Sequence, residues 1–192
     1  IPNMVTSVLA SYRAYDTMGE VIVVFAALVG VLALIGVREQ KSPRPVYPTD
    51  DRPPRPVLQV MAKLLIPYIL IFALYVQFHG EYGPGGGFQA GVIFASAIIL
   101  YVLTFGLDDA YELIAPSVLR PLAALGVLLY GGTGVVTMLM GGTFLNYNVL
   151  ADNPVTGQLY GIIVIEFGVG LTVATVMMLI FYAFISRGEK PA

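Results

Sequence analysis

The chain has 192 residues, of which 57% are hydrophobic and only 11% charged, with a formal net charge of −2. A soluble domain carries roughly a quarter charged residues, so this composition indicates a membrane protein and argues against nucleic-acid binding. The chain has no cysteine and one histidine, His79. That excludes disulfides and iron–sulfur clusters built from this chain and argues against a self-contained zinc or haem site, so we expect neither metal nor cofactor.

Five apolar segments are each predicted to form a helix that crosses the bilayer, which needs about 20 residues. In chain order they are Val21–Val37 (with the helix beginning by Met18), Val57 or Leu58 to Phe78, Phe88–Phe105, about Val118–Met140 and about Gln158–Ile185. The expected fold class is therefore an all-α integral membrane helical bundle with about five transmembrane helices.

The stretch from residue 39 to residue 56 differs in composition from everything around it. It is rich in proline, at positions Pro43, Pro45, Pro48, Pro53, Pro54 and Pro56. Such density favours an extended connector and is typical of a boundary between two units. We expect a single-span segment over 1–38, a linker over 39–56 and a four-span domain over 57–192; a long surface loop is the alternative.

The basic residues predict the orientation. With five crossings, nine of the ten fall on one side of the membrane and only Arg13 falls on the other. The nine are Arg38, Lys41, Arg44, Arg52, Arg55, Lys63, Arg120, Arg187 and Lys190. Cytoplasmic loops carry the excess of lysine and arginine. The expected location is a cell membrane, with the N-terminus outside and the linker and the C-terminus in the cytoplasm.

A glycine- and proline-rich loop is predicted between the second and third spans, on the extracytoplasmic side. It contains Pro84, Gly85, Gly86 and Gly87, which end one helix and allow a tight turn before the next. Gly87, Gly91 and Ala95 then follow at intervals of four, a spacing that lets membrane helices approach closely. We expect these residues to serve the turn and helix packing.

Glu166 is the strongest candidate for chemistry, because it is a lone carboxylate about eight residues into the last apolar segment. An ionisable group at that depth is costly and faces protein or water. It either lies on an ion path or only locks helices together through hydrogen bonds, and we weigh the two readings equally.

Other titratable residues are weaker candidates for the ion path. His79 and Glu81 flank the start of the loop, where His79 could relay protons or, as we slightly favour, cap the free carbonyls of the second span. Asp16 and Glu20 precede the first span. Thr17-Met18-Gly19-Glu20 matches a capping box, which competes with an ion-path role.

Two stretches resemble the MnhB-like subunit of the Mrp-type sodium/proton antiporters. Residues 78–92 read FHGEYGPGGGFQAGV and contain a PGGGF signature, and residues 161–173 read GIIVIEFGVGLTV, similar to the last helix of that family with its intramembrane glutamate. The motif RAYDTMGE at 13–20 resembles a second element, the C-terminal end of the large Mrp subunit. This element is a separate small subunit in archaeal membrane-bound hydrogenases.

The resemblance implies a small, non-catalytic membrane subunit of a multisubunit Mrp-type cation/proton antiporter module. Its partners would be the other membrane subunits, with Na+ and H+ as the transported ions. The resemblance also implies a prokaryotic membrane and leaves open a respiratory parent complex, such as a membrane-bound hydrogenase or a sulfur reductase. The alternative is a purely structural helix bundle that braces or seals such a complex.

Overall fold

The computed structural model describes residues 2–35 and 56–188, and the elements over these ranges are all helical. They are α1 (Met4–Ser7), the π-helical η1 (Val8–Tyr12), α2 (Ala14–Leu34), α3 (Pro56–His79), α4 (Gly87–Phe105), α5 (Leu107–Leu113), α6 (Pro116–Leu139), the 3-10 helix η2 (Tyr147–Leu150) and α7 (Pro154–Gly188). The predicted linker lies outside the described residues except for Pro56, which begins α3.

Five of these helices, α2, α3, α4, α6 and α7, are long and apolar enough to cross a membrane, which confirms the predicted all-α bundle. The short helices α1, η1, α5 and η2 were not predicted from the sequence. Each is too short to give a clear apolar period of its own.

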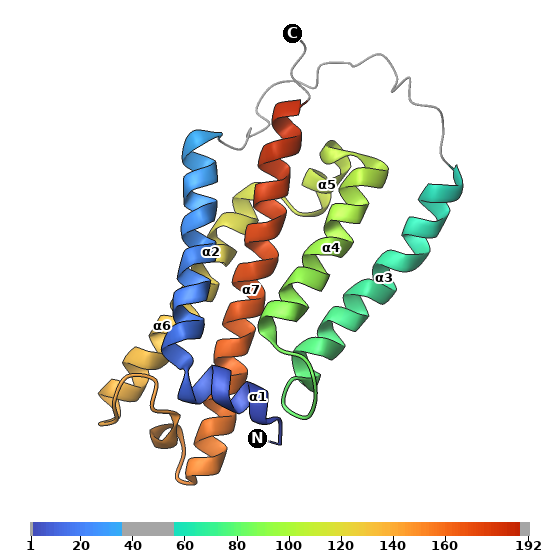
Figure 1. Ribbon diagram of the computed structural model, residues 1–192. Helices are drawn as coiled ribbons and strands as arrows, with labels where there is room; N and C mark the ends of the chain where they lie inside the picture. The colour runs from blue at the N-terminus through green and yellow to red at the C-terminus, as the bar shows by residue number, and fades with distance from the viewer. Residues whose placement is uncertain (1, 36–55, 189–192) are drawn as a thin grey trace.

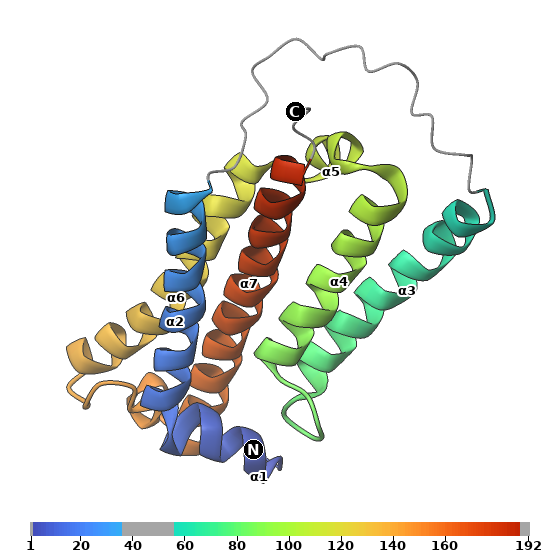
Figure 2. The same ribbon diagram turned by 45° about the horizontal axis from the view of Figure 1, so that its top comes forward.

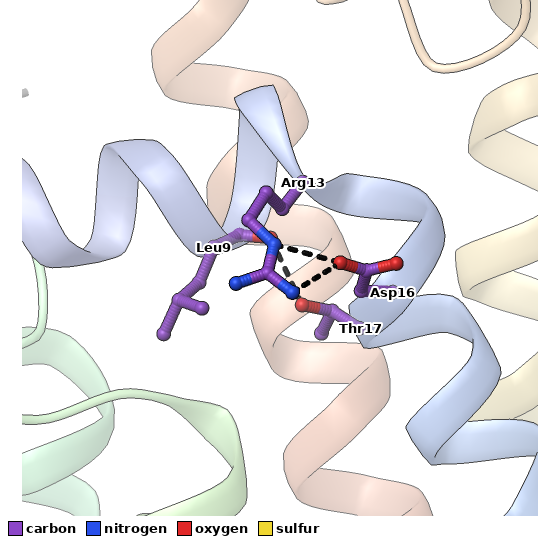
Figure 3. A network of polar contacts seen from close by, with 4 residues as sticks. All are labelled: Leu9, Arg13, Asp16 and Thr17. Atoms are coloured by element: carbon purple, nitrogen blue, oxygen red, sulfur yellow. Dashed lines mark hydrogen bonds and ion pairs between the residues drawn. The ribbon is translucent and has the colours of Figure 1, made fainter.

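The predicted capping box at Thr17–Glu20 is wrong. The first span begins at Ala14, so Thr17 lies inside α2 and its hydroxyl donates to the Leu9 carbonyl oxygen at 2.9 Å. Because η1 leads into α2 with only Arg13 between them, the helix start needs no Thr17 cap. Arg13 lies at the N-cap position, and its guanidinium pairs with Asp16 at 2.6 Å (Figure 3).

Helix α7 forms the centre of the bundle, with α4 and α6 packed along it and α2 against both α6 and α7 (Figures 1 and 2). α3 is the outermost helix and packs mainly on α4. Within the structure 67% of the α7 span is buried, against 11% for α2 and α3. The outer helices therefore present most of their apolar surface to lipid or to other membrane proteins.

Glycines bring three of these helices into backbone contact. A Cβ atom added at Gly87 of α4 would overlap the carbonyl oxygen of Glu166, and one added at Gly91 would lie 2.7 Å from the carbonyl oxygen of Gly170. On α6, a Cβ at Gly126 would lie 2.5 Å from the carbonyl oxygen of Gly168. Such close approach is how small residues pack membrane helices.

Not every glycine of the small-residue pattern has this role. A Cβ added at Gly30 of α2, or at Gly131 or Gly132 of α6, would meet nothing within 4 Å. These three glycines therefore make no close helix contact within the described residues. Spacing alone does not reveal which side of a helix faces a neighbour.

Candidate functional site

Glu166 lies on the central helix, twelve residues after Pro154, which places it about 18 Å along the axis from the start of α7. The sequence-based expectation put it nearer the helix end, because α7 was expected to begin at Gln158. Asn153 caps the true start, with its Oδ1 accepting from the backbone N–H of Val155 at 2.9 Å. Asparagine followed by proline is a common helix start, so this signal was readable in the sequence.

The glycine loop surrounds the Glu166 carboxylate. A Cβ atom added at Gly80 would lie 3.3 Å from Oε2, and one added at Gly86 would lie 3.3 Å from Oε1. Gly86 also has a φ of +137°, which side-chain-bearing residues rarely adopt. The half-buried carboxylate has no hydrogen-bond partner among the residues that the structure describes. The loop therefore leaves room for the carboxylate only because glycines stand at positions 80 and 86, and the carboxylate oxygens stay free to bind a proton or a cation.

A cavity of about 530 Å³ opens on one side of Glu166, bounded by the N-terminal helices, α2, α4 and α7. Its polar lining comes from five side chains on four different parts of the chain: Thr6, Thr17, Glu20, Gln89 and Glu166. Glu20 and Glu166 are 146 positions apart in the sequence. Only the packing of α2 against α7 brings them to one cavity.

A second cavity of about 310 Å³ also has Glu166 in its wall and is otherwise bounded by α3, the loop after it, α6 and α7. Its polar residues are Gln77, Glu81 and Glu166, and its remaining lining is apolar. Glu166 is therefore shared by two cavities, with Glu20 in the wall of one and Glu81 in the wall of the other. A carboxylate in that position can exchange protons or attract cations from either cavity.

His79 and Asp16 are not among the residues that line these two cavities. The His79 ring stacks on Tyr75 with centroids 4.8 Å apart and covers Gly83. The predicted capping is supplied by backbone instead, because the His79 carbonyl accepts from the N–H groups of Tyr82 and Gly83 at 3.0 and 3.1 Å. Asp16 pairs with Arg13 on an exposed surface, as Figure 3 shows.

The remaining predicted loop residues divide by position. Pro84 is exposed in the loop, whereas Gly85 folds back onto the end of α3, where an added Cβ would lie 2.6 Å from the Val76 carbonyl oxygen. Gly87 and Gly91 face α7 from α4. The structure therefore places the loop glycines around Glu166 and the first turns of α4 directly against the helix that carries it.

Two polar residues near the chain start, Asn3 and Thr6, contact the loop and were not singled out from the sequence. The Asn3 side-chain amide donates to the carbonyl oxygen of Gly80 at 2.9 Å, and the Thr6 hydroxyl donates to the same oxygen at 2.8 Å. Their partners lie more than 70 positions away along the chain. No local pattern could have indicated these contacts.

Two buried tyrosines join separate parts of the bundle: Tyr130 joins α6 to the start of α2, and Tyr147 of η2 packs on α7. The buried Tyr130 hydroxyl on α6 donates to the Ala14 carbonyl oxygen at 2.8 Å, at the start of α2. Tyr147 is fully buried next to Gly161, where an added Cβ would overlap its ring. Burial raises the pKa of the Tyr147 phenol, so this side chain stays neutral at physiological pH.

On the ion-path reading of Glu166, we predict that Gly86→Ala impairs ion flux through a complex containing this chain more than Gly106→Ala does. Both glycines have positive φ, +137° and +104°, so alanine strains the backbone at either position. Only at Gly86 does the new methyl group contact Glu166; at Gly106 nothing lies within 4 Å. The measurement is ion flux at equal complex content, and equal losses for the two variants would show that backbone strain alone accounts for the effect.

Among the described residues, no group of three or more histidine, cysteine, aspartate or glutamate side chains is arranged to hold a metal ion. The chemistry available at the site is that of carboxylates, amides and hydroxyls around two cavities. These groups can take up protons or offer oxygen atoms to a passing cation.

Solved structures resemble the whole chain. It matches a chain of the Mrp complex from Dietzia sp. DQ12-45-1b at 26% identity with a TM-score of 0.69, covering 98% of this chain and 22% of the other. It also matches a chain of the membrane-bound sulfane sulfur reductase, an archaeal respiratory membrane complex, at 32% identity with a TM-score of 0.73, covering 95% and 77%. The chain thus spans about a fifth of the Mrp chain that it matches.

Sequence comparison gives the family. The chain is 34% identical over 125 residues to the mnhB2 protein of Staphylococcus aureus (strain Newman), named as an antiporter subunit, covering 65% of this chain and 88% of that protein. The family model described as "Domain related to MnhB subunit of Na+/H+ antiporter" matches residues 57–179, which include the glycine loop and Glu166. The chain therefore belongs to the family of domains related to the MnhB subunit of Na+/H+ antiporters.

Proposed function

We propose that this chain is a non-catalytic membrane subunit of a multisubunit Mrp-type cation/proton antiporter module in a prokaryotic cell membrane, where it contributes to Na+/H+ translocation. Family membership, the relative named as an antiporter subunit and the likeness to a chain of the Mrp complex support this function. Other membrane subunits are its partners.

The observation that carries the proposal is the position of Glu166. The carboxylate has no hydrogen-bond partner among the described residues, lies on the most buried helix and borders two cavities, each with one further carboxylate in its wall. A buried carboxylate that only tied helices together would be hydrogen-bonded to its neighbours. Glu166 instead serves as the residue at which protons or cations pass between the two cavities.

The parent complex is either an antiporter or a respiratory enzyme that drives one. The likeness to the sulfane sulfur reductase supports the second possibility as directly as the Mrp complex supports the first. We assign 1–38 to a segment like the end of the large Mrp subunit, ahead of the four-span domain. The Mrp match covers 98% of this chain and therefore extends beyond the four-span domain.

A purely structural role is the alternative function. It is favoured by the buried centre of α7 and by the backbone contacts at Gly87, Gly91 and Gly126, which are typical of a scaffold. The two roles depend on different properties of Glu166. A structural role needs only the volume of its side chain, whereas an ion path needs its titratable carboxyl group.

The proposed function is tested by purifying the complex through a tag on this chain and reconstituting it into vesicles. We expect several other membrane proteins to co-purify and Na+ addition to dissipate an imposed pH gradient, as followed with a pH-sensitive dye. A preparation in which no other membrane protein accompanies this chain, or one that does not respond to Na+, would contradict the proposal.

The proposed orientation has the N-terminus outside and the C-terminus in the cytoplasm. The first turns of α3 and α6, the helices that contain Lys63 and Arg120, lie at the end of the bundle that carries α5, and α2, which follows Arg13, begins at the opposite end (Figure 1). This arrangement supports the proposed orientation. We predict that tags at the C-terminus and between Pro43 and Pro56 are protected in intact cells, whereas a tag at Tyr82, which is 70% exposed, is accessible to added protease. Tags at the C-terminus and in the linker that report opposite sides would refute the five-span arrangement.

A further inference from the structure

The N-terminal segment lies across the end of the bundle where the glycine loop approaches α7 (Figures 1 and 2). Asn3 holds this loop with its side chain and its backbone. Its Nδ2 donates to the carbonyl oxygens of Gly80 and Gly83 at 2.9 and 2.5 Å, and its backbone N–H donates to the carbonyl oxygen of Glu81 at 3.0 Å. One asparagine therefore contacts three residues of the turn after α3.

Thr6 completes this contact. Its side chain is only 4% exposed, its hydroxyl donates to the Gly80 carbonyl oxygen at 2.8 Å, and it accepts from Asn3 Nδ2 at 3.0 Å. The Oδ1 atom of Asn3 accepts from the N–H of Val5 at 3.0 Å and caps α1. The Asn3 amide thus serves two purposes, since its oxygen starts the helix and its nitrogen holds the loop.

Gly80 connects these contacts to the site. Its carbonyl oxygen receives both Asn3 and Thr6, and an added Cβ at this residue would lie 3.3 Å from Oε2 of Glu166 and 2.9 Å from the backbone nitrogen of Gly86. The position of the loop around the carboxylate therefore depends on where Gly80 is held. A hydrogen-bonded turn between two helices is otherwise free to open locally.

The same segment also forms a wall of the larger cavity. Val5, Thr6, Leu9 and Ala10 line the cavity that contains Glu20 and Glu166. Removing the contacts to the loop would allow this segment to move away from the bundle. The cavity would then open at the end where α1 now covers it.

We propose that Asn3 and Thr6 are positioning residues for Glu166: they hold the Gly80–Gly87 loop around its carboxylate and close the cavity at that end. The inference rests on the proposed function of Glu166 in ion movement. Within the described part of the chain, the side-chain hydrogen bonds of Asn3 and Thr6 go to the loop and to α1 and not to the carboxylate, so both residues act through the loop.

The test uses a thiol inside the cavity. The chain has no cysteine, so Val169→Cys introduces its only thiol at a position that lines the cavity and is 4% exposed. The complex is placed in lipid nanodiscs, where both membrane faces are accessible, and the labelling rate of this chain by a charged thiol reagent is measured with and without Asn3→Asp and Thr6→Val. Asn3→Asp keeps the capping oxygen but removes the donor, and Thr6→Val keeps the shape but removes the hydroxyl.

We expect the double change to speed labelling at position 169 at least about tenfold, because several hydrogen bonds that favour the closed state are lost. It should also reduce ion flux at equal complex content. The single variants at position 6, with Asn3 unchanged, give a further comparison. Thr6→Ser keeps the hydroxyl and should label slowly and transport at the parental rate, whereas Thr6→Val should not. A thiol at Val155, which is 72% exposed at the start of α7, should label equally in all backgrounds.

Unchanged labelling at position 169 would overturn the proposal, and so would faster labelling with parental flux. If the double variant does not assemble, Thr6→Val alone is measured in the same way. Faster labelling with reduced flux then supports the proposal, and either unchanged labelling or parental flux overturns it. Failure of the proposed function is distinguished by Glu166→Gln. If that variant transports normally, Glu166 has no role in flux, while the labelling rates still show whether the segment closes the cavity.

Discussion

Glu166→Gln is expected to leave the complex assembled and to lower its Na+-dependent proton exchange by at least about tenfold, which corresponds to about 1.4 kcal/mol in the transport barrier. Glutamine keeps the volume of the side chain, so it fits the space beside Gly80 and Gly86 that the carboxylate now fills. It cannot take up or release a proton, and it offers a neutral oxygen in place of a carboxylate. Flux in vesicles is measured after the subunit content has been verified on a gel.

Asp109→Asn is the matched control for Glu166→Gln. It makes the same chemical change at an exposed carboxylate on α5, at the other end of the bundle, and should transport at the parental rate. Parental transport by the Glu166→Gln complex would instead support the bracing role. Glu20→Gln and Glu81→Gln extend the experiment, one in each cavity. Passage through both cavities predicts a loss of transport with either change, and a loss with only one of them would show that the other cavity is not on the path.

Gly87→Ala is expected to destabilise the complex by about 1–3 kcal/mol, the usual cost of overpacking a filled interior. The added methyl group would overlap the carbonyl oxygen of Glu166 and lie close to the backbone nitrogen of Gly170. Backbone atoms of α7 cannot turn aside as a flexible side chain can, so α4 and α7 must separate. We expect a lower melting temperature of the purified complex and less of this chain bound in it.

Gly30→Ala is the control for this change, since it adds the same methyl group to a membrane helix at a position with nothing within 4 Å. Alanine favours the helix over glycine by roughly 1 kcal/mol, so the melting temperature should stay constant or rise. Similar melting temperatures for the two variants would mean that α4 and α7 are not in backbone contact at Gly87.

The five spans, the loop between α3 and α4 and the intramembrane position of Glu166 were all predictable from the sequence. Each depends on a property of one segment. An apolar run long enough for the bilayer forms a helix, because a helix satisfies its own backbone hydrogen bonds there. A glycine–proline cluster ends a helix. The start of α7 at Asn153-Pro154 was readable in the same way but was placed four residues too late, at Gln158.

Composition also indicated which glycines could pack but not which ones do. Gly87, Gly91 and Gly126 meet backbone atoms of α7, whereas Gly30 faces open space, although its spacing from Ala26 is the same as that of Gly91 from Gly87. The difference lies in the rotation of each helix toward its neighbours. That rotation is set by the packing of all five spans together.

The sequence by itself determined that this chain is a membrane bundle with one carboxylate deep in its last helix, because hydrophobic length and helix breaking are local properties of the chain. Only the tertiary structure decided what surrounds that carboxylate. Glu20 and Glu81 each line one of the two cavities that Glu166 borders, and Asn3 and Thr6 hold the loop from more than 70 positions away. Such long-range contacts depend on how helices distant in the sequence pack together, and the periodicity of a single segment does not predict them.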